Sequence, residues 1–175
     1  TIVRPSHTYD PMSIPIHGGW TVIDRMLRSE EVIVHGDGTS LWTLTHHKDF
    51  AKGFIGLLGN PLMIGEAYHI TSDEWLTWNQ IHQILAEKAG VIARIVHVPS
   101  DVINSYDPEW GASLLGDKSY CAIFDNSKIK QFVPGFQASI PFLKGAEEII
   151  AWHMANPSSR VLNDRTNILL SRIIA

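Results

Sequence analysis

The sequence predicts an α/β fold in which parallel strands contribute part of the core. Short runs rich in β-branched residues alternate with longer segments whose apolar residues recur at helical spacing. Turns containing Gly or Pro separate these segments, for example at 36–38 and 59–61. Because strands that alternate with helices are typical of helical crossovers, we expect several of the strands to pair in parallel.

The composition fits one folded domain, or part of one. The chain has 175 residues, of which 45% are hydrophobic and 18% are charged, so it can bury a core and is neither disordered nor fibrous. A formal net charge of −4 and a pI near 6.1 give no overall attraction for nucleic acid or for anionic membranes. We therefore expect small molecules or other subunits as partners.

The single cysteine, Cys121, excludes an internal disulfide and any CxxC motif, which suits a reducing cytosol. We expect it to be a small buried hydrophobe beside Ala122 and Ile123. No apolar run reaches the roughly 18 residues that span a bilayer. These features predict a soluble, cytoplasmic protein without membrane contact.

The first part of the chain is expected to fold in the order strand, helix, strand, strand, helix. The predicted elements are a buried strand closed by Arg4-Pro5, a helix over 20–28, strands over 32–35 and 41–45, and a helix over 50–58. Asp49 stands where a helix N-cap belongs, and Gly59-Asn60-Pro61 should end the helix.

The second part alternates strands and helices again. The predicted elements are a strand over 67–70, a helix over 77–88, a strand over 94–99, a short helix opened by Ser100 or Asp101, a strand end at 124–130 leading into a brief helix capped by Asp125 or Asn126, and helices over 140–155 and 163–174. Thr77 is the expected N-cap of its helix and Gly90 its stop. Segment 106–118 is expected to be a helix with a loop that lines a pocket, and Trp75 and Trp78 should pack against the sheet.

Four segments in a fixed order resemble a known family. They are Val3 to Pro11, similar to R-x-x-N-x-Y-G-P; Gly36-Asp37-Gly38 through His46-His47-Lys48-Asp49-Phe50-Ala51, similar to G-D-G followed by h-V-D-D-h-A; Ala67 to Ser72 with Leu76-Thr77-Trp78; and Asp125-Asn126-Ser127-Lys128 with Gly145, similar to D-x-S-K followed by e-G. Each segment is weak alone, and their shared order and spacing carry the assignment. Over nearly its whole length, less clearly after Asn156, the chain resembles the C-terminal portion of an NAD-dependent epimerase/dehydratase of the extended short-chain dehydrogenase/reductase family.

The resemblance implies the C-terminal part of a Rossmann-type protein, with the last parallel strands of the dinucleotide-binding sheet and a small mixed α/β substrate-binding subdomain. The chain opens inside a strand, so we expect residues 1–175 to be the substrate-binding part of a longer protein whose N-terminal dinucleotide-binding half is absent. The glycine-rich turn and the Tyr-x-x-x-Lys pair of the family belong to that half. No lysine stands four residues after any tyrosine here, which are Tyr9, Tyr68, Tyr106 and Tyr120. We therefore assign no catalytic residue in this chain and expect it to be inactive alone.

The resemblance also implies site residues, because the family's loop after this strand passes the nicotinamide end of the cofactor and the reacting part of the substrate. Pro5 and Ser6 are the candidate cofactor-binding residues, for NAD or NADP held mainly by the N-terminal half. His7, Tyr9 and Trp42 are the candidate substrate-binding residues. His7 stands where many relatives carry Asn, and an imidazole can likewise donate and accept hydrogen bonds. A structural role in the loop is the alternative for His7.

Trp42 stands where relatives that act on nucleotide-linked sugars usually carry Arg, whose guanidinium grips a diphosphate bidentately. An indole cannot neutralise a phosphate, so the departure favours a less charged substrate. Plain packing is the alternative for Trp42. No metal site is expected, because His46 and His47, as neighbours on a strand, should point to opposite faces.

Together these features predict an NAD(P)-dependent epimerase, dehydratase or reductase that acts on a sugar-like or other small hydroxyl or carbonyl substrate. The expected partners are that substrate and the N-terminal half of the same protein, and a homodimer is left open. The main alternative is an RNA-binding or regulatory module similar to chloroplast stem-loop-binding proteins, whose pattern resembles Tyr68-His69-Ile70-Thr71-Ser72 and Thr77-Trp78. The acidic balance counts against it. A free-standing ligand-binding or interaction domain is the third hypothesis, against which an uncovered sheet edge would argue.

Overall fold

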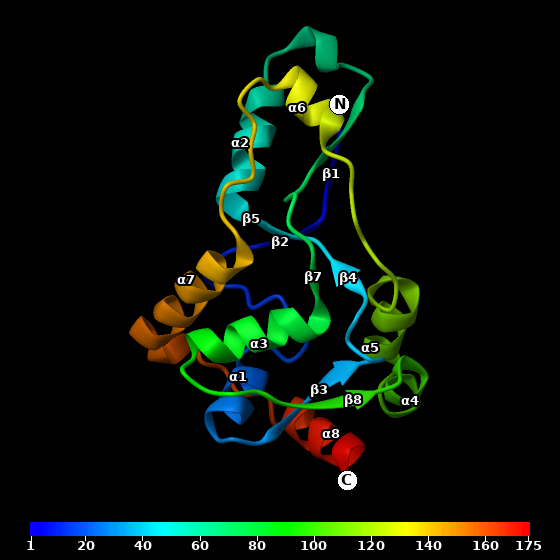
Figure 1. The fold of residues 1–175 in the computed structure, drawn as a ribbon, viewed down its shortest axis with the longest axis vertical. Helices are drawn as coiled ribbons and strands as arrows, with labels where there is room; N and C mark the ends of the chain where they lie inside the picture. Colours follow the sequence, from blue (N-terminus) through cyan, green and yellow to red (C-terminus); the bar gives the residue numbers. More distant parts are fainter.

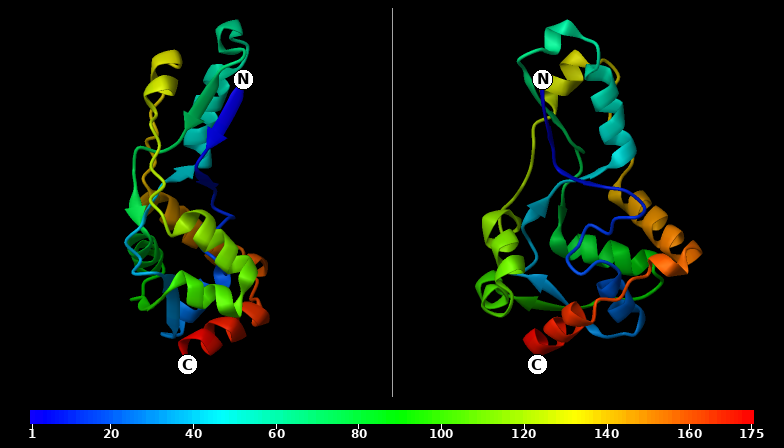
Figure 2. Two further views of the ribbon diagram at one scale, coloured as in Figure 1. Left: turned by 90° about the vertical axis from the view of Figure 1, so that its right-hand side faces the viewer. Right: turned by 180° about the vertical axis from the view of Figure 1, so that it is seen from behind.

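Residues 1–175 are described by a computed structural model in which the chain forms two lobes (Figure 1). The upper lobe of Figure 1 holds the N-terminus, and the lower lobe holds most of the helices and the C-terminus. Figure 2 shows from two further sides that the termini lie at opposite ends of the molecule. Each lobe has a hydrophobic core of its own, with 6 buried residues in the upper core and 24 in the lower.

The strands are short and form four separate pairs. In chain order they are β1 (Ile2–Pro5), β2 (His7–Tyr9), β3 (Glu31–His35), β4 (Leu41–Trp42), β5 (Leu44–His46), β6 (Ala67–Ile70), β7 (Leu76–Thr77) and β8 (Arg94–Val98). The pairs β1–β6, β2–β5 and β3–β8 are parallel, and β4–β7 is antiparallel. The parallel component predicted from the alternation of strands and helices is thus confirmed, and the fold is mixed α/β.

Helices make up most of the lower lobe and flank the strands of the upper lobe. They are α1 (Trp20–Leu27), α2 (His47–Leu57), α3 (Trp78–Lys88), α4 (Ser100–Tyr106), α5 (Pro108–Ser113), α6 (Ser127–Phe132), α7 (Phe142–Ala155) and α8 (Asp164–Ile174). Single turns of 3-10 helix at Pro61–Met63 and Pro157–Ser159 and a π-helical turn at Leu114–Lys118 complete the set. None of the helices combines the length and the apolar character needed to cross a membrane.

Helix α3 shows how local sequence sets an element. The Thr77 side chain accepts a hydrogen bond from the Gln80 amide, and the Gln80 side chain accepts one from the Thr77 amide, which completes a capping box. The apolar side chains Trp78, Ile81 and Leu85 then face the lower core. The helix ends before Gly90, whose φ of +76° suits glycine. Both predicted ends of this helix are confirmed.

The upper core is built by β1, β6, α2 and α6, and its close packing depends on two glycines of α2. A side chain at Gly53 would collide with Ile70 and Phe136, and one at Gly56 would collide with Val133. Tyr68 and Ile70 of β6 are buried between these helices. Helix α2 therefore packs closely on the parallel pair β1–β6. This arrangement is typical of the edge of a larger α/β sheet.

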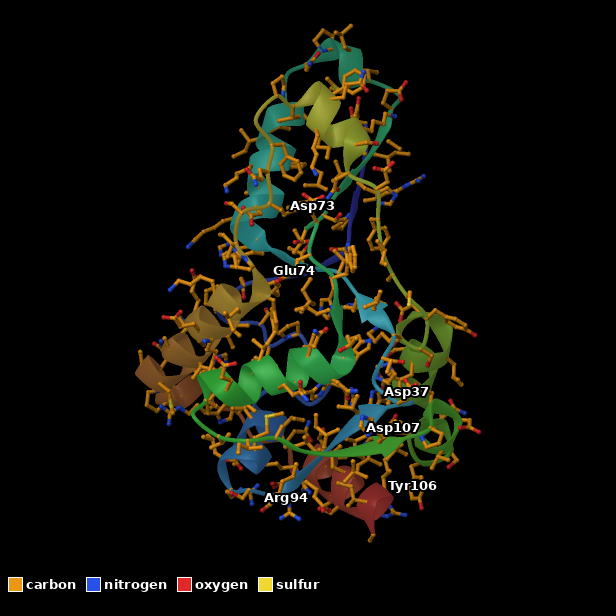
Figure 3. All side chains as sticks on the ribbon, viewed as in Figure 1. Asp37, Asp73, Glu74, Arg94, Tyr106 and Asp107 are labelled. Atoms are coloured by element: carbon orange, nitrogen blue, oxygen red, sulfur yellow. The ribbon has the colours of Figure 1, made fainter.

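Two consecutive carboxylates of the β6–β7 loop hold the region where the lobes meet, and Figure 3 labels Asp73 above Glu74 there. Asp73 receives the Lys130 ammonium at 2.8 Å, which ties the β6–β7 loop to α6. Glu74 accepts a 2.7 Å hydrogen bond from the Phe142 amide, the first residue of α7. An anion at that end of a helix also interacts favourably with the helix dipole.

Several expectations were wrong in detail. The strand expected at 41–45 is divided at Thr43 into β4 and β5, because Thr43 Oγ1 donates to the Ala122 carbonyl and the chain changes pairing partner there. Asp49 is not an N-cap, since α2 begins at His47 and the His46 side chain caps it. Asp49 lies buried in the first turn and accepts from the Ile140 amide at 2.8 Å.

Other side chains also depart from the expectation. Cys121 is exposed instead of buried, because the segment after the π-helical turn contributes only an isolated bridge between Ala122 and Trp42. No strand forms at 124–130, where the chain passes directly into α6. Trp78 is buried as predicted, whereas Trp75 is 52% exposed. The rings of His46 and His47 lie 4.5 Å apart and do not point to opposite faces, because His47 already belongs to α2.

Candidate functional site

A cavity of about 230 Å³ lies in the lower lobe, where segments from most of the chain meet. Its walls come from the loop that follows β2, from β3, from α1, α3, α5 and α8, and from the π-helical turn. The lining residues are His7, Ile14, Pro15, Ile16, His17, Val22, Ile33, His35, Trp78, His82, Trp110, Ser113, Leu114, Lys118 and Leu170. Four of them are histidines, which makes imidazole the main polar group of the cavity.

One wall is formed by the loop between β2 and α1. The loop starts with a turn in which Asp10 Oδ1 accepts hydrogen bonds from the Met12 and Ser13 amides. It continues past the cavity to His17, whose ring stacks on Trp110 with 4.2 Å between centroids. Trp110 lies in α5, so the predicted role of segment 106–118 in lining a pocket is confirmed.

His7 is held in one tautomer by Trp42. The Trp42 indole N–H donates a 3.1 Å hydrogen bond to Nδ1 of His7. An indole nitrogen can only donate, so Nδ1 must carry the lone pair and Nε2 must carry the proton. His7 therefore offers an N–H donor, and Trp42, itself buried, lies behind the cavity wall and not in it.

His35 and His82 each leave an acceptor nitrogen free, where His7 leaves a donor. Nε2 of His35 lies 2.9 Å from the Lys118 carbonyl, and Nδ1 of His82 lies 2.8 Å from the Trp78 carbonyl. Because a carbonyl only accepts, each of these nitrogens carries the proton. The remaining nitrogens, Nδ1 of His35 and Nε2 of His82, are therefore hydrogen-bond acceptors.

All four imidazoles of the cavity favour the neutral form. Burial lowers the pKa of His7, His17 and His35 from the ordinary value of 6.5, and it lowers the pKa of His82 to about 4. The nearby Lys118 ammonium lowers the pKa of His7 and His35 further. At neutral pH these rings hydrogen-bond without carrying charge.

The other predicted site residues lie in different places. Tyr9 does not line the cavity, and its ring packs against His46 and Phe142. Pro5 ends β1 at the carboxyl edge of the β1–β6 pair. Ser6 follows there, and its hydroxyl lies 2.6 Å from that of Thr45, which accepts from the Ser72 amide. A polar cluster thus forms where parallel strands end, which is the edge at which ligands bind in α/β sheets.

Local sequence patterns do not predict His17 and His82 as site residues, whereas Trp110 lies in segment 106–118, which was expected to line a pocket. The three residues belong to segments that are far apart in the chain and meet only through tertiary packing. His35 ends the strand expected over 32–35, and the structure places its ring beside Trp78, with 5.1 Å between ring centroids. The one available signal was the high number of histidines, 9 in 175 residues, without metal-ligand spacing.

Comparisons with known proteins agree with the fold. No protein-family model matches the chain. The chain is 28% identical over 157 residues to a dTDP-glucose 4,6-dehydratase of Actinoplanes sp., covering 90% of this chain and 44% of that protein. It is 23% identical over 172 residues to the chloroplast stem-loop binding protein of 41 kDa b of Arabidopsis thaliana, covering 98% of this chain and 40% of that protein.

Among solved structures, the UDP-glucuronic acid 4-epimerase of Bacillus cereus in complex with UDP-glucuronic acid and NAD superposes with a TM-score of 0.65. The identity is 18%, and the match covers 88% of this chain and 45% of the epimerase. The chain thus spans less than half of the length of the relatives that it matches. It has the fold of the C-terminal portion of the NAD-dependent epimerases/dehydratases of the extended short-chain dehydrogenase/reductase family, as its motifs predict.

Proposed function

We propose that this chain is the substrate-binding portion of an NAD(P)-dependent epimerase, dehydratase or reductase that acts on a sugar-like or other small hydroxyl or carbonyl substrate. The observation that carries the proposal is the position of His7. It follows the carboxyl end of β1 by two residues and its ring lines the cavity. In α/β sheets the cofactor and the substrate meet at that edge. Under this proposal His7 donates a hydrogen bond to the substrate, and Trp42 positions the His7 ring.

The remaining part of the active site is assigned to an N-terminal half of the same protein. β1 pairs only with β6, so its other edge offers unpaired backbone groups to a further strand. Beside it, α2 and the following turn expose apolar side chains, among them Ile55, Leu58 and Ile64 at 61% exposure or more. An apolar groove between β1 and α2 includes Val3, Phe54 and Leu57. A patch of this kind is typical of a surface that another part of a protein covers.

The residues of this chain fit only one end of a dinucleotide. Pro5 and Ser6 lie at the strand edge where the nicotinamide would stand, and the chain carries no glycine-rich turn to hold a pyrophosphate. When bound, NAD or NADP would supply the hydride acceptor or donor. The Ser6–Thr45 hydrogen bond orients the Ser6 hydroxyl at that edge. The homodimer and the cytoplasmic location expected from the sequence stay predictions.

The first test compares cofactor binding by residues 1–175 with binding by the longer protein. We expect the longer protein to bind NAD or NADP and the 175-residue chain to bind it weakly or not at all, because the pyrophosphate site lies elsewhere. Isothermal titration calorimetry of both proteins measures this. Tight cofactor binding or turnover by residues 1–175 alone would contradict the proposal, and so would a longer protein that binds neither cofactor.

The second test replaces His7 by Asn in the longer protein. Asn keeps an acceptor for the Trp42 N–H but lacks the donor at the position of Nε2, so packing behind the cavity is preserved. We expect KM for a substrate of NAD(P)-dependent turnover to rise about tenfold, equivalent to about 1.4 kcal/mol of lost hydrogen bonding. Thr8→Ala, on an exposed neighbour, is the control and should leave KM unchanged. Unchanged KM and kcat in both His7→Asn and His7→Ala, the second of which has no side-chain donor at all, would remove His7 from the site.

RNA binding is the second candidate function, favoured by the match to the chloroplast stem-loop binding protein. The formal net charge of −4 opposes it, because nucleic-acid binding rests mainly on cationic contacts with phosphates. A gel-shift titration of the longer protein with a stem-loop RNA at about 0.15 M salt separates the candidates. Saturable RNA binding without NAD(P) binding would favour the RNA-binding module.

A further inference from the structure

We propose that the cavity takes an uncharged ligand of monosaccharide size, which is recognised by imidazoles whose free nitrogens are fixed as one donor and two acceptors, and does not take a nucleotide-linked substrate. The inference rests on the proposed function in one respect: only that function identifies the ligand of the cavity as the substrate of an enzyme. The binding site itself is argued from the cavity alone.

The cavity presents a mixed set of hydrogen-bonding groups. The Nε2–H of His7 is a donor, because Trp42 occupies Nδ1. Nδ1 of His35 and Nε2 of His82 are acceptors, because backbone carbonyls take up the protons of their other nitrogens. No protein hydrogen bond uses these three remaining nitrogens. Hydroxyl groups both donate and accept, so a ligand with several hydroxyls matches such a set.

The wall of the cavity contains one more unsatisfied group. The indole N–H of Trp78 is buried and has no hydrogen-bond partner, although Trp78 lines the cavity and is only 4% exposed. A buried donor without a partner costs roughly 1–3 kcal/mol. This nitrogen has almost no solvent-accessible surface, so it lies behind the cavity wall, and a ligand would meet the ring of Trp78 and not its N–H. Aromatic faces of Trp78 and of the stacked His17–Trp110 pair supply the apolar contact that sugar rings and other small alicyclic ligands need.

The charge of the cavity does not suit a diphosphate. Lys118 is the only lysine or arginine among the lining residues. Its ammonium is already 3.0 Å from Asp117 and lies 5.3 Å from the centre of the Trp42 ring. The imidazoles stay neutral at neutral pH because burial lowers their pKa. A diphosphate would therefore lose its hydration without gaining a bidentate cationic partner.

The size of the cavity points in the same direction. Pockets for drug-sized ligands span roughly 300–1,000 Å³, and this one has about 230 Å³. A nucleoside diphosphate together with a sugar is at least drug-sized and needs a pocket within that range. The cavity has room for the sugar-sized part alone.

The test uses the longer protein and measures binding directly by calorimetry, with D-glucose, D-galactose and L-rhamnose as uncharged probes and UDP and dTDP as nucleotide probes. We expect saturable binding of at least one hexose and none of either nucleotide. His82→Leu should weaken hexose binding at least tenfold. His153→Leu is the matched control, because His153 is also buried in a helix and donates from Nδ1 to the carbonyl four residues earlier, but does not line the cavity.

A second measurement does not depend on how the variants fold. Long-range proton–nitrogen NMR spectra of the histidine-labelled protein at pH 7 should show His7 protonated on Nε2, His35 on Nε2 and His82 on Nδ1, with shifts of these signals when the hexose binds. Charged imidazoles, nucleotide binding, or no binding of any hexose would each overturn the proposal. If the longer protein binds NAD but no hexose, this inference is wrong and the proposed function stands. If it binds a hexose but not NAD, the proposed function is wrong and the hexose site stands.

Discussion

Replacing Gly145 by Ala should destabilise the protein by about 2 kcal/mol. Gly145 lies in α7, and a Cβ at this position would fall on the hydroxyl and ring edge of Tyr9. Tyr9 cannot move aside, because its ring packs edge-on against both His46 and Phe142 at 5.4 Å. Overpacking of this kind costs up to about 3 kcal/mol, and the better helix propensity of Ala returns about 1 kcal/mol. Urea unfolding of both proteins measures the difference.

Two comparisons isolate the cause. Gly116→Ala is the control, because Gly116 lies in a helical turn with open space around it, and there Ala should be neutral or slightly stabilising. Tyr9→Phe removes the hydroxyl, which is buried without a partner, so this change alone should cost little. Gly145→Ala should then cost about 1 kcal/mol less in the Tyr9→Phe background. Equal costs in the two backgrounds would show that Tyr9 is not the obstacle.

Acidification from pH 7 to pH 5 should destabilise the fold by about 2 kcal/mol through His82 alone. The pKa of His82 is lowered to about 4 in the folded chain, chiefly by burial, from 6.5 in the unfolded chain. Below pH 6.5 His82 is therefore protonated in the unfolded chain but stays neutral in the folded chain. The free energy of unfolding falls with pH until the pH reaches about 4, where the folded chain also binds the proton. Burial also lowers the pKa of His7, His17, His35 and His46, which acts in the same direction.

Urea unfolding at pH 7 and pH 5 measures this loss, and His82→Leu should reduce it by about 2 kcal/mol whatever its effect at pH 7. His97→Gln is the control, because His97 is exposed on β8. The acidic residues add little to the change in stability between pH 7 and pH 5. Carboxyls such as Asp49 and Asp125 have a lowered pKa, so their effect on stability occurs in more acidic solutions. The same pH dependence in His82→Leu and in the unmodified protein would show that His82 is not the buried base.

Elements defined by local signals could be predicted from the sequence. Thr77, Gln80 and Gly90 fix the ends of α3 through contacts within a few residues, and the runs of β-branched residues mark β3 and β8. Asp49 shows the limit of such signals. Its residue type suits a cap, but its carboxylate is used by the Ile140 amide, 91 residues away, and by Lys52. Only the packing of the loop before α7 decides between the two roles.

The candidate site could be predicted where the family resemblance touched it and where segment 106–118 was expected to line a pocket. His7 was found because it follows the strand that ends at Pro5. His82 faces inward from α3 and at the level of sequence looks like any residue of an apolar helix face. Its role depends on meeting His7 and His35, which lie 75 and 47 positions earlier in the chain. Such a meeting depends on the arrangement of β3, α3 and the loop after β2, which local patterns do not contain.

The hydrogen bond between Trp42 and His7 makes the two side chains a single hydrogen-bonded unit. If Trp42 alone were changed to Arg, the guanidinium would be buried beside the His7 imidazole, whose pKa is lowered. Without a phosphate as partner, the desolvation of this cation would be uncompensated. If His7 alone were changed to an apolar residue, the buried indole N–H would lose its acceptor. Under the proposed function, a substitution at either position therefore also changes the hydrogen bonding of the other, and the two side chains influence the substrate together.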